Sequence, residues 1–135
     1  MAQAQAFVQA CDDFRIQKTL QQFFEYNLNL YAIDLKTDVG GVKDIVEGGM
    51  KRDWIFQNLQ SSIDNHQVNR IILFNHTDCT GYGGSRAFEN LEAEVRQHEI
   101  QLRHAASDVK AKFPEKEVEA YLIVLGSSGE IKKVV

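Results

Sequence analysis

Short apolar runs alternate with segments of helical periodicity along almost the whole chain, and this alternation limits the folds that the chain can adopt. The apolar runs cover residues 6–10, 28–35, 70–75 and 118–125, and each is short enough and apolar enough for a buried strand. Apolar residues recur at helical spacing over 16–26, 50–65 and 88–109. Strands separated by helices indicate βαβ units, whose right-handed crossovers place helices on both faces of a sheet.

The predicted fold is therefore α/β, with three layers (α-β-α) and a mostly parallel central sheet. Residues 126–129 predict a turn, and residues 130–135 are expected to return as an antiparallel edge strand at the C-terminus. The chain has one proline and neither a repeat nor a linker-like stretch, so we expect a single domain over residues 1–135. Four aromatic side chains are expected in the core: Phe23, Phe24, Trp54 and Phe88.

Composition argues against two classes of partner. The formal net charge is −4, and a weakly acidic chain has no general attraction for nucleic acid. The longest apolar run falls short of the ~20 residues that span a bilayer, so we expect no membrane segment. The first residues lack the basic and apolar regions of a signal peptide, which predicts a cytoplasmic location where cysteines stay reduced.

The candidate metal ligands follow two of the predicted strands. Ligands of parallel sheets bind beyond the carboxyl ends of the strands. Cys11 follows the first apolar run, while His76 and Cys79 follow the third. If these two strands are neighbours, one imidazole and two thiols meet at one point. This donor set suits Zn²⁺ and leaves a fourth position open, as in catalytic zinc sites.

Simpler interpretations exist for each of these residues. A single cysteine after a buried strand is usually a small core side chain, and a pair of thiols can also act as a redox sensor. Asp13 and Arg15, which closely follow Cys11, fit an ordinary structural role as a helix cap and a solvated ion pair. The other histidines do not follow strands; His98 is expected in the core, His66 at a helix end and His104 in solvent.

Two motifs taken together carry a family resemblance. Residues 11–15 (CDDFR) have the form C-x-D-x-R, and residues 76–79 (HTDC) have the form H-x-x-C. In this order and at this separation, they make the chain similar to the β-class carbonic anhydrases. The alternating elements between the motifs and the C-terminal strand also resemble that family, so the resemblance covers nearly the whole chain.

The resemblance implies a function and a role for each motif residue. Cys11, His76 and Cys79 would bind one zinc ion per chain, and Asp13 and Arg15 would form the catalytic pair. The implied reaction is the reversible hydration of carbon dioxide to bicarbonate by zinc-bound hydroxide. Asp13 would accept a hydrogen bond from that hydroxide, and Arg15 would keep Asp13 ionised, while release by Arg15 would let Asp13 bind zinc itself. A homodimer or higher homo-oligomer is also implied.

The chain departs from the family pattern at three places. Residues 37–41 (TDVGG) stand where the family usually has Arg-Asn-Ala-Gly, and Thr80 precedes Gly81 where a glycine usually follows the cysteine directly. We expect no counterpart of the N-terminal helical arm of many relatives, so part of a dimer interface would differ. The changed loop leaves hydrolysis of carbonyl sulfide or carbon disulfide open as an alternative. A catalytically silent, zinc-binding regulatory protein is a further alternative.

Overall fold

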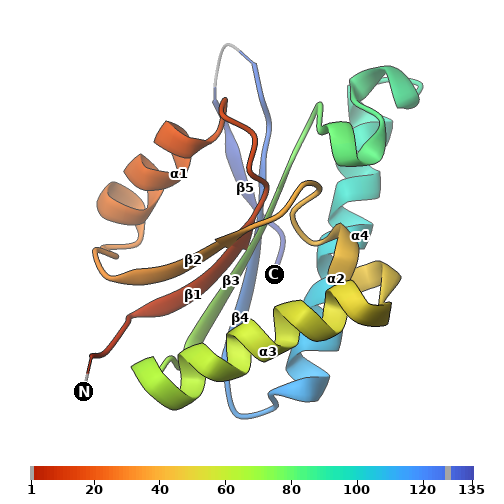
Figure 1. Ribbon diagram of the computed structural model, residues 1–135. Helices are drawn as coiled ribbons and strands as arrows, with labels where there is room; N and C mark the ends of the chain where they lie inside the picture. Colours follow the sequence, from red (N-terminus) through yellow and green to blue (C-terminus); the bar gives the residue numbers. More distant parts are fainter. Residues whose placement is uncertain (1, 127–128) are drawn as a thin grey trace.

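A single sheet forms the centre of the computed structural model, which describes residues 2–126 and 129–135 (Figure 1). In this part of the chain the sheet has five strands in the order β2-β1-β3-β4-β5. The strands are β1 (Ala6–Ala10), β2 (Ile33–Thr37), β3 (Arg70–His76), β4 (Glu117–Ile123) and β5 (Ile131–Lys133). β1 to β4 are parallel and β5 runs antiparallel to β4, which confirms the predicted α/β fold and its C-terminal edge strand.

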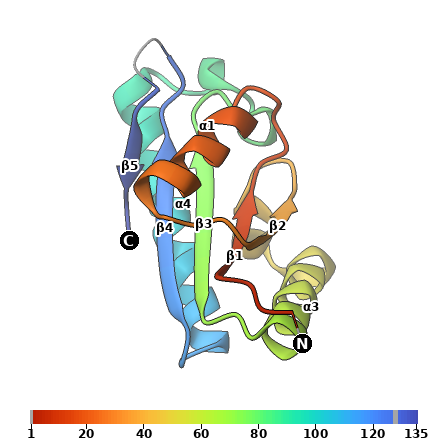
Figure 2. The same cartoon turned by 90° about the vertical axis from the view of Figure 1, so that its left-hand side faces the viewer.

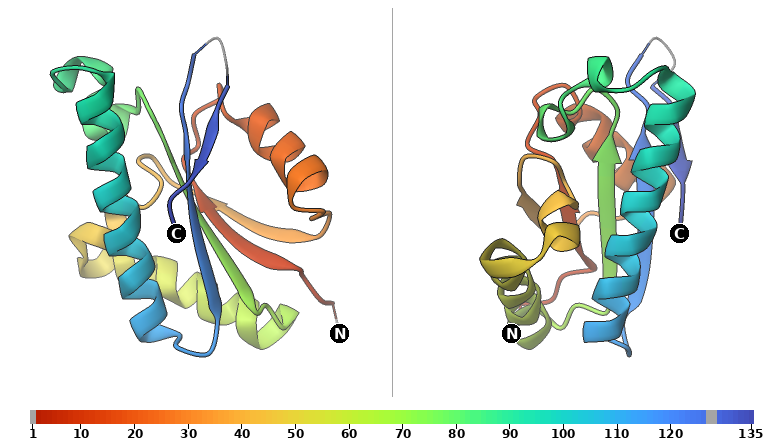
Figure 3. Two further views of the ribbon diagram at one scale, coloured as in Figure 1. Left: turned by 180° about the vertical axis from the view of Figure 1, so that it is seen from behind. Right: turned by 90° about the vertical axis from the view of Figure 1, so that its right-hand side faces the viewer.

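The helices cover both faces of this sheet. They are α1 (Gln17–Gln22), α2 (Lys43–Glu47), α3 (Gly49–His66) and α4 (Leu91–Lys112), with a π-helical turn, η1 (Phe23–Asn27), directly after α1. Two single turns of 3₁₀ helix, η2 (Thr80–Tyr82) and η3 (Ser85–Ala87), follow β3. Helix α1 lies on one face, while α2, α3 and α4 lie on the other, as expected for three layers (Figures 2 and 3). Within the described residues, no helix is both long and apolar enough to span a membrane.

Alternation along the strands divides the buried side chains between two cores. Successive strand residues point to opposite faces, so neighbours in sequence enter different cores. One core packs against α2, α3 and α4 and includes Phe7, Ile71, Leu73 and Leu122. The other packs against α1 and includes Val8, Ile72, Phe74 and Ile123. Full burial of one such side chain stabilises the fold by about 1.5–3 kcal/mol.

The second strand begins later than the apolar pattern predicts. Residues 28–32 are a connection, because Asn29 adopts a left-handed conformation with φ of 55°. Leu30 lies buried against α1, where its N–H donates to the carbonyl oxygen of Phe24 at 2.8 Å. Leu30 and Leu28 therefore pack into the core on the α1 side instead of extending the sheet, Tyr31 is exposed, and the strand starts at Ile33.

Helix α3 has the predicted position, but its first turns face solvent. Met50 is 88% exposed and Trp54 is 59% exposed, so the expectation that Trp54 belongs to the core is wrong. Ile55 and Leu59 carry the buried face of the helix instead. Trp54, Met50 and Val39 line an open groove of about 840 Å³ beside the loop that follows β2. The predicted turn at 126–129 includes residues 127 and 128, which lie outside the described residues.

Candidate metal centre

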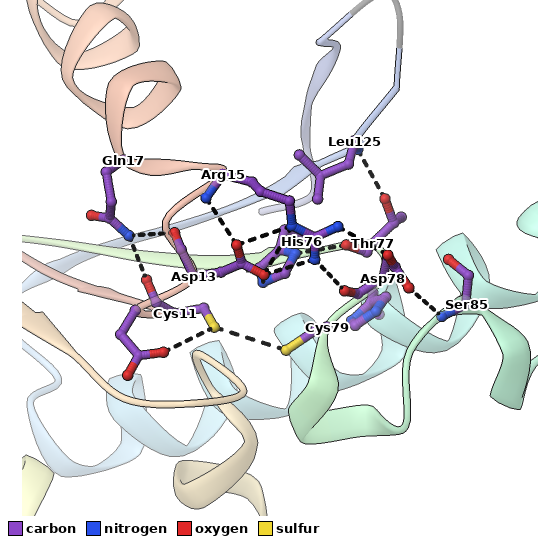
Figure 4. Close-up of polar contacts among 12 residues, drawn as sticks. Cys11, Asp13, Arg15, Gln17, His76, Thr77, Asp78, Cys79, Ser85 and Leu125 are labelled. Carbon is purple, nitrogen blue, oxygen red and sulfur yellow. Dashed lines mark hydrogen bonds and ion pairs between the residues drawn. The ribbon is translucent and has the colours of Figure 1, made fainter.

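The first and third strands lie side by side, and this places the ends of both motifs together. β1 pairs with β3 in parallel, with Gln9 opposite Leu73. Cys11 follows β1, His76 is the last residue of β3, and Cys79 lies in the loop beyond it. The ligand atoms of these three buried side chains all lie within 4.8 Å of one another (Figure 4).

The geometry of the three side chains fits a bound cation. The sulfurs of Cys11 and Cys79 are 3.9 Å apart. Two thiolates on a tetrahedral zinc ion lie about 3.8 Å apart when each bond is ~2.3 Å. His76 Nδ1 donates to the carbonyl oxygen of Thr77 at 2.6 Å, which leaves Nε2 as the nitrogen that can bind a metal. Nε2 is buried and has no hydrogen-bond partner among the described residues.

The two thiols shift each other's pKa in opposite directions. A hydrogen bond from Cys79 lowers the pKa of Cys11, and the His76 imidazole and the Gly40 N–H lower it further. The same hydrogen bond, together with burial, raises the pKa of Cys79. Zinc binds the thiolate form of cysteine, so metal binding would release the thiol protons. Burial alone would lower the pKa of His76, but the Cys11 sulfur and the Thr77 carbonyl raise it overall.

A carboxylate lies next to these ligand atoms. Asp13 Oδ2 is 3.8 Å from His76 Nε2. The guanidinium of Arg15 donates to both oxygens of Asp13, through Nε at 3.1 Å to Oδ1 and through Nη2 at 2.8 Å to Oδ2. These hydrogen bonds from Arg15 lower the pKa of Asp13 to about 2. The carboxyl group is therefore ionised throughout the physiological range, and Figure 4 shows it between the guanidinium and the imidazole.

Arg15 has a second partner that the sequence did not indicate. Its Nη1 contacts Oδ2 of Asp78 at 3.0 Å, and its Nη2 donates to the carbonyl oxygen of Asp78 at 2.8 Å. Asp78 itself is held by the N–H of Ser85, which donates to Oδ1 at 2.9 Å, and by the carboxylate of Glu94. Helical spacing was the available signal for Glu94, because it lies four residues before His98, which is expected in the core, and so shares its helix face.

The loop after β2 lies close to the cysteines although its sequence departs from the family pattern. Asp38 accepts a hydrogen bond from Gln9 at 2.8 Å and pairs with Lys36 at 2.9 Å, which anchors the loop to the sheet. A Cβ on Gly81 would lie 2.7 Å from the Cα of Gly40, so the two loops meet backbone to backbone. The glycines therefore allow this close approach, whereas the charged side chain of Asp38 is used for anchoring.

The remaining histidines take other positions, as predicted. His98 is buried on α4, where its Nδ1 contacts the Asn75 amide at 3.1 Å and its ring packs edge-on against Tyr82. Burial lowers the pKa of His98 to about 4, so it is neutral at neutral pH. His66 ends α3 and His104 is exposed. Among the described residues, the group of three ligands includes none of these histidines.

Comparisons with known proteins give the family. The profile of a family described as "Putative carbonic anhydrase" matches residues 1–135. A search of curated proteins found no match. Solved structures also match, and the three described next are 13% or 14% identical to this chain. At this level of identity, a structural match shows the fold alone.

Three solved structures illustrate the similarity. One belongs to the two tetrameric β-carbonic anhydrases of the ascomycete Sordaria macrospora, with a TM-score of 0.66, 13% identity, and coverage of 99% of this chain and 82% of that one. Another is β-carbonic anhydrase isoform I of Trichomonas vaginalis, with a TM-score of 0.66, 14% identity, and coverage of 99% and 84%. The third is the carbonic anhydrase of Glaciozyma antarctica, with a TM-score of 0.64, 14% identity, and coverage of 100% and 85%. The resemblance inferred from the two motifs is thus confirmed, and the chain belongs to a family of carbonic anhydrases with the β-class fold.

Proposed function

We propose that this protein catalyses the reversible hydration of carbon dioxide to bicarbonate, with one zinc ion per chain held by Cys11, His76 and Cys79. The observation that carries the proposal is the convergence of three buried ligand atoms within 4.8 Å beside an ionised carboxylate. Membership of a carbonic anhydrase family supports the choice of reaction. The donor set of two sulfurs and one imidazole supports the choice of metal.

The residues around the site divide the work of this reaction. Zinc, when bound, would act as a Lewis acid that makes a water molecule nucleophilic near neutral pH. Asp13 accepts a hydrogen bond from the reacting water and so orients it toward carbon dioxide. Arg15 keeps Asp13 ionised and fixes the direction of its carboxylate, because the guanidinium binds both of its oxygens. Cys11 and Cys79 are each 2% exposed, so the metal would be held by buried sulfurs.

Metal analysis combined with a stopped-flow hydration assay tests the proposal. We expect one zinc ion per wild-type chain and hydration of carbon dioxide above the buffer rate. Asp13→Asn should lower kcat/KM about a hundredfold and leave the zinc content unchanged, because the amide is a poor proton acceptor. Asp64→Asn is the matched control: it makes the same charge change at an exposed position near the end of α3.

Two outcomes would reject the proposal. A zinc-loaded wild-type protein without hydration above buffer would indicate a silent zinc-binding protein. Release of sulfide from carbonyl sulfide or carbon disulfide, without hydration of carbon dioxide, would identify a hydrolase of those substrates instead. Both assays use the same samples, so they separate the three functions directly.

A further inference from the structure

We propose that Glu94 and Asp78 are positioning residues that hold Arg15 against Asp13. They would thereby keep the Asp13 carboxylate in place beside the metal ligands. The effect on turnover rests on the proposed function, whereas the effect on Arg15 can be measured without any activity.

Arg15 bridges the loops that follow β1 and β3. Its guanidinium binds Asp13, in the loop after β1, and both the side chain and the carbonyl oxygen of Asp78, in the loop after β3. The side chain of Arg15 is 36% exposed. Its orientation therefore depends on these two partners more than on packing, and loss of the Asp78 contacts would free it to turn toward solvent.

The backbone of Asp78 is held in a left-handed conformation by its neighbours. Its φ is 55°, a left-handed conformation that is unfavourable for a residue other than glycine and that persists only when the surroundings hold it. The Asp78 N–H donates to Glu94 Oε2 at 2.7 Å. Ser85 N–H holds Asp78 Oδ1 at 2.9 Å, so that Oδ2 and the carbonyl oxygen remain directed at Arg15.

The carboxylate of Glu94 is 1% exposed. Burial of a carboxylate is costly unless both oxygens are hydrogen-bonded. Here Oε2 accepts from the Asp78 N–H, and Oε1 accepts from Ser85 Oγ at 2.8 Å. His98 Nε2, on an imidazole that is neutral at neutral pH, lies 4.0 Å from Oε2. Both oxygens of Glu94 are thus used by the loop after β3, which carries Cys79, and the 22-residue helix α4 provides the rigid support.

Together these contacts form a chain from α4 to the site. Glu94 fixes the Asp78 backbone, Asp78 fixes Arg15, and Arg15 fixes Asp13. Without Glu94, the N–H of Asp78 would lose its acceptor and the left-handed conformation would relax. The two Asp78 acceptors would then leave Arg15, and Asp13 would keep its charge partner only part of the time.

Truncation of Glu94 is the direct test, with conservative and matched variants beside it. Glu94→Ala removes the acceptor, whereas Glu94→Gln keeps an oxygen for the Asp78 N–H and serves as the rescue variant. Asp78→Asn presents an amide N–H₂ to Arg15 while its oxygen stays with Ser85. Glu99→Ala is the matched control, because it truncates a glutamate of the same helix that contacts Arg103 and Lys132.

Three measurements are made on each variant: zinc per chain, kcat and KM for hydration, and the ¹H–¹⁵N signal of Arg15 Nε, identified by its absence in Arg15→Lys. Glu94→Ala and Asp78→Asn should keep their zinc, lose about tenfold in kcat with little change in KM, and lose the Arg15 Nε signal to solvent exchange. Glu94→Gln and Glu99→Ala should retain the signal. The double variant Glu94→Ala/Asp78→Asn should be no worse than Glu94→Ala, because both act through Arg15.

An unchanged Arg15 Nε signal in Glu94→Ala and Asp78→Asn would overturn the proposal. Loss of zinc with an intact signal would also overturn it, because Glu94 would then act on the metal ligands. Asp78 is half-exposed, so Asp78→Asn decides the question if Glu94→Ala fails to fold. If the wild type does not hydrate carbon dioxide, the proposed function fails, while the Arg15 signal still tests the positioning role.

Discussion

Gly41, in the loop after β2, lies directly against the backbone of β3. Its φ is +60°, and a Cβ there would lie 2.3 Å from the carbonyl oxygen of Phe74 and 2.5 Å from Oδ1 of Asn75. The same Asn75 oxygen accepts the N–H of Val42 at 3.0 Å, which ties the start of α2 to the sheet. A single residue without a side chain thus decides how closely this loop approaches the strand that carries His76.

Gly41→Ala should therefore lower the free energy of unfolding by at least ~2 kcal/mol, because steric overlap adds to the backbone cost. Denaturant unfolding measures this. Gly49→Ala is the matched control: Gly49 has a similar φ of +74°, but a Cβ there would meet no atom within 4 Å. Its loss should be about 1 kcal/mol. Equal losses in the two variants would contradict the steric explanation.

At the scale of elements, β2 is an edge strand that one side chain connects to α3. Asp34 Oδ2 accepts a hydrogen bond from Ser62 Oγ at 2.7 Å and contacts His66 Nδ1 at 2.7 Å. Burial alone would raise the pKa of Asp34, but the hydrogen bonds from Ser62 and His66 bring it below its usual value. The ionised carboxylate therefore stabilises the folded state by holding the strand to the helix.

Asp34→Asn should lower the free energy of unfolding by about 1–2 kcal/mol at neutral pH. Because the folded-state pKa of Asp34 is lowered, its contribution is complete above the unfolded-state pKa of about 3.9 and is lost as the pH falls below it. The difference between wild type and variant should therefore shrink below about pH 4, as measured by chemical unfolding at several pH values. Asp64→Asn is the control, because Asp64 is exposed on α3, and it should show neither effect. A difference between wild type and Asp34→Asn that does not depend on pH would rule out the ionic role of Asp34.

At the scale of the whole molecule, the candidate metal centre joins parts of the chain that are far apart in sequence. The Cys11 and Cys79 sulfurs come from residues 68 positions apart, at the ends of two neighbouring strands. Metal held there would bind the folded state more tightly than the unfolded chain, so binding would add to the free energy of unfolding. A ligand present at about a thousand times its Kd contributes about 4 kcal/mol.

Removal of zinc with a chelator should lower Tm by about 10 °C and make Cys11 and Cys79 reactive toward a thiol reagent. Differential scanning fluorimetry and thiol counting before and after chelation measure both effects. In Cys79→Ser the metal site is already incomplete, so Tm should not respond to the chelator. A zinc-loaded wild type with the same Tm and the same thiol reactivity after chelation would exclude ligation by these cysteines.

The sequence alone was enough to predict the layered α/β fold and the three residues that meet at the sheet edge. Apolar periodicity is a local property, and it distinguishes strands from helices wherever a segment has one buried face. Cys11 and His76 could be located because ligands of parallel sheets gather beyond the carboxyl ends of the strands. The C-x-D-x-R and H-x-x-C motifs also predicted the family.

The tertiary structure decided the contacts between distant segments. Leu30 is as apolar as a strand residue, yet it covers α1, because only the packed molecule offers that surface. Trp54 lies beside the buried Ile55 but faces solvent, since a helix turns by about 100° per residue. Helical spacing places Glu94 on the same face as His98, but only the folded loop brings the Asp78 N–H to it. Local patterns report which face of an element is buried, whereas partners across the fold depend on the packing of the whole chain.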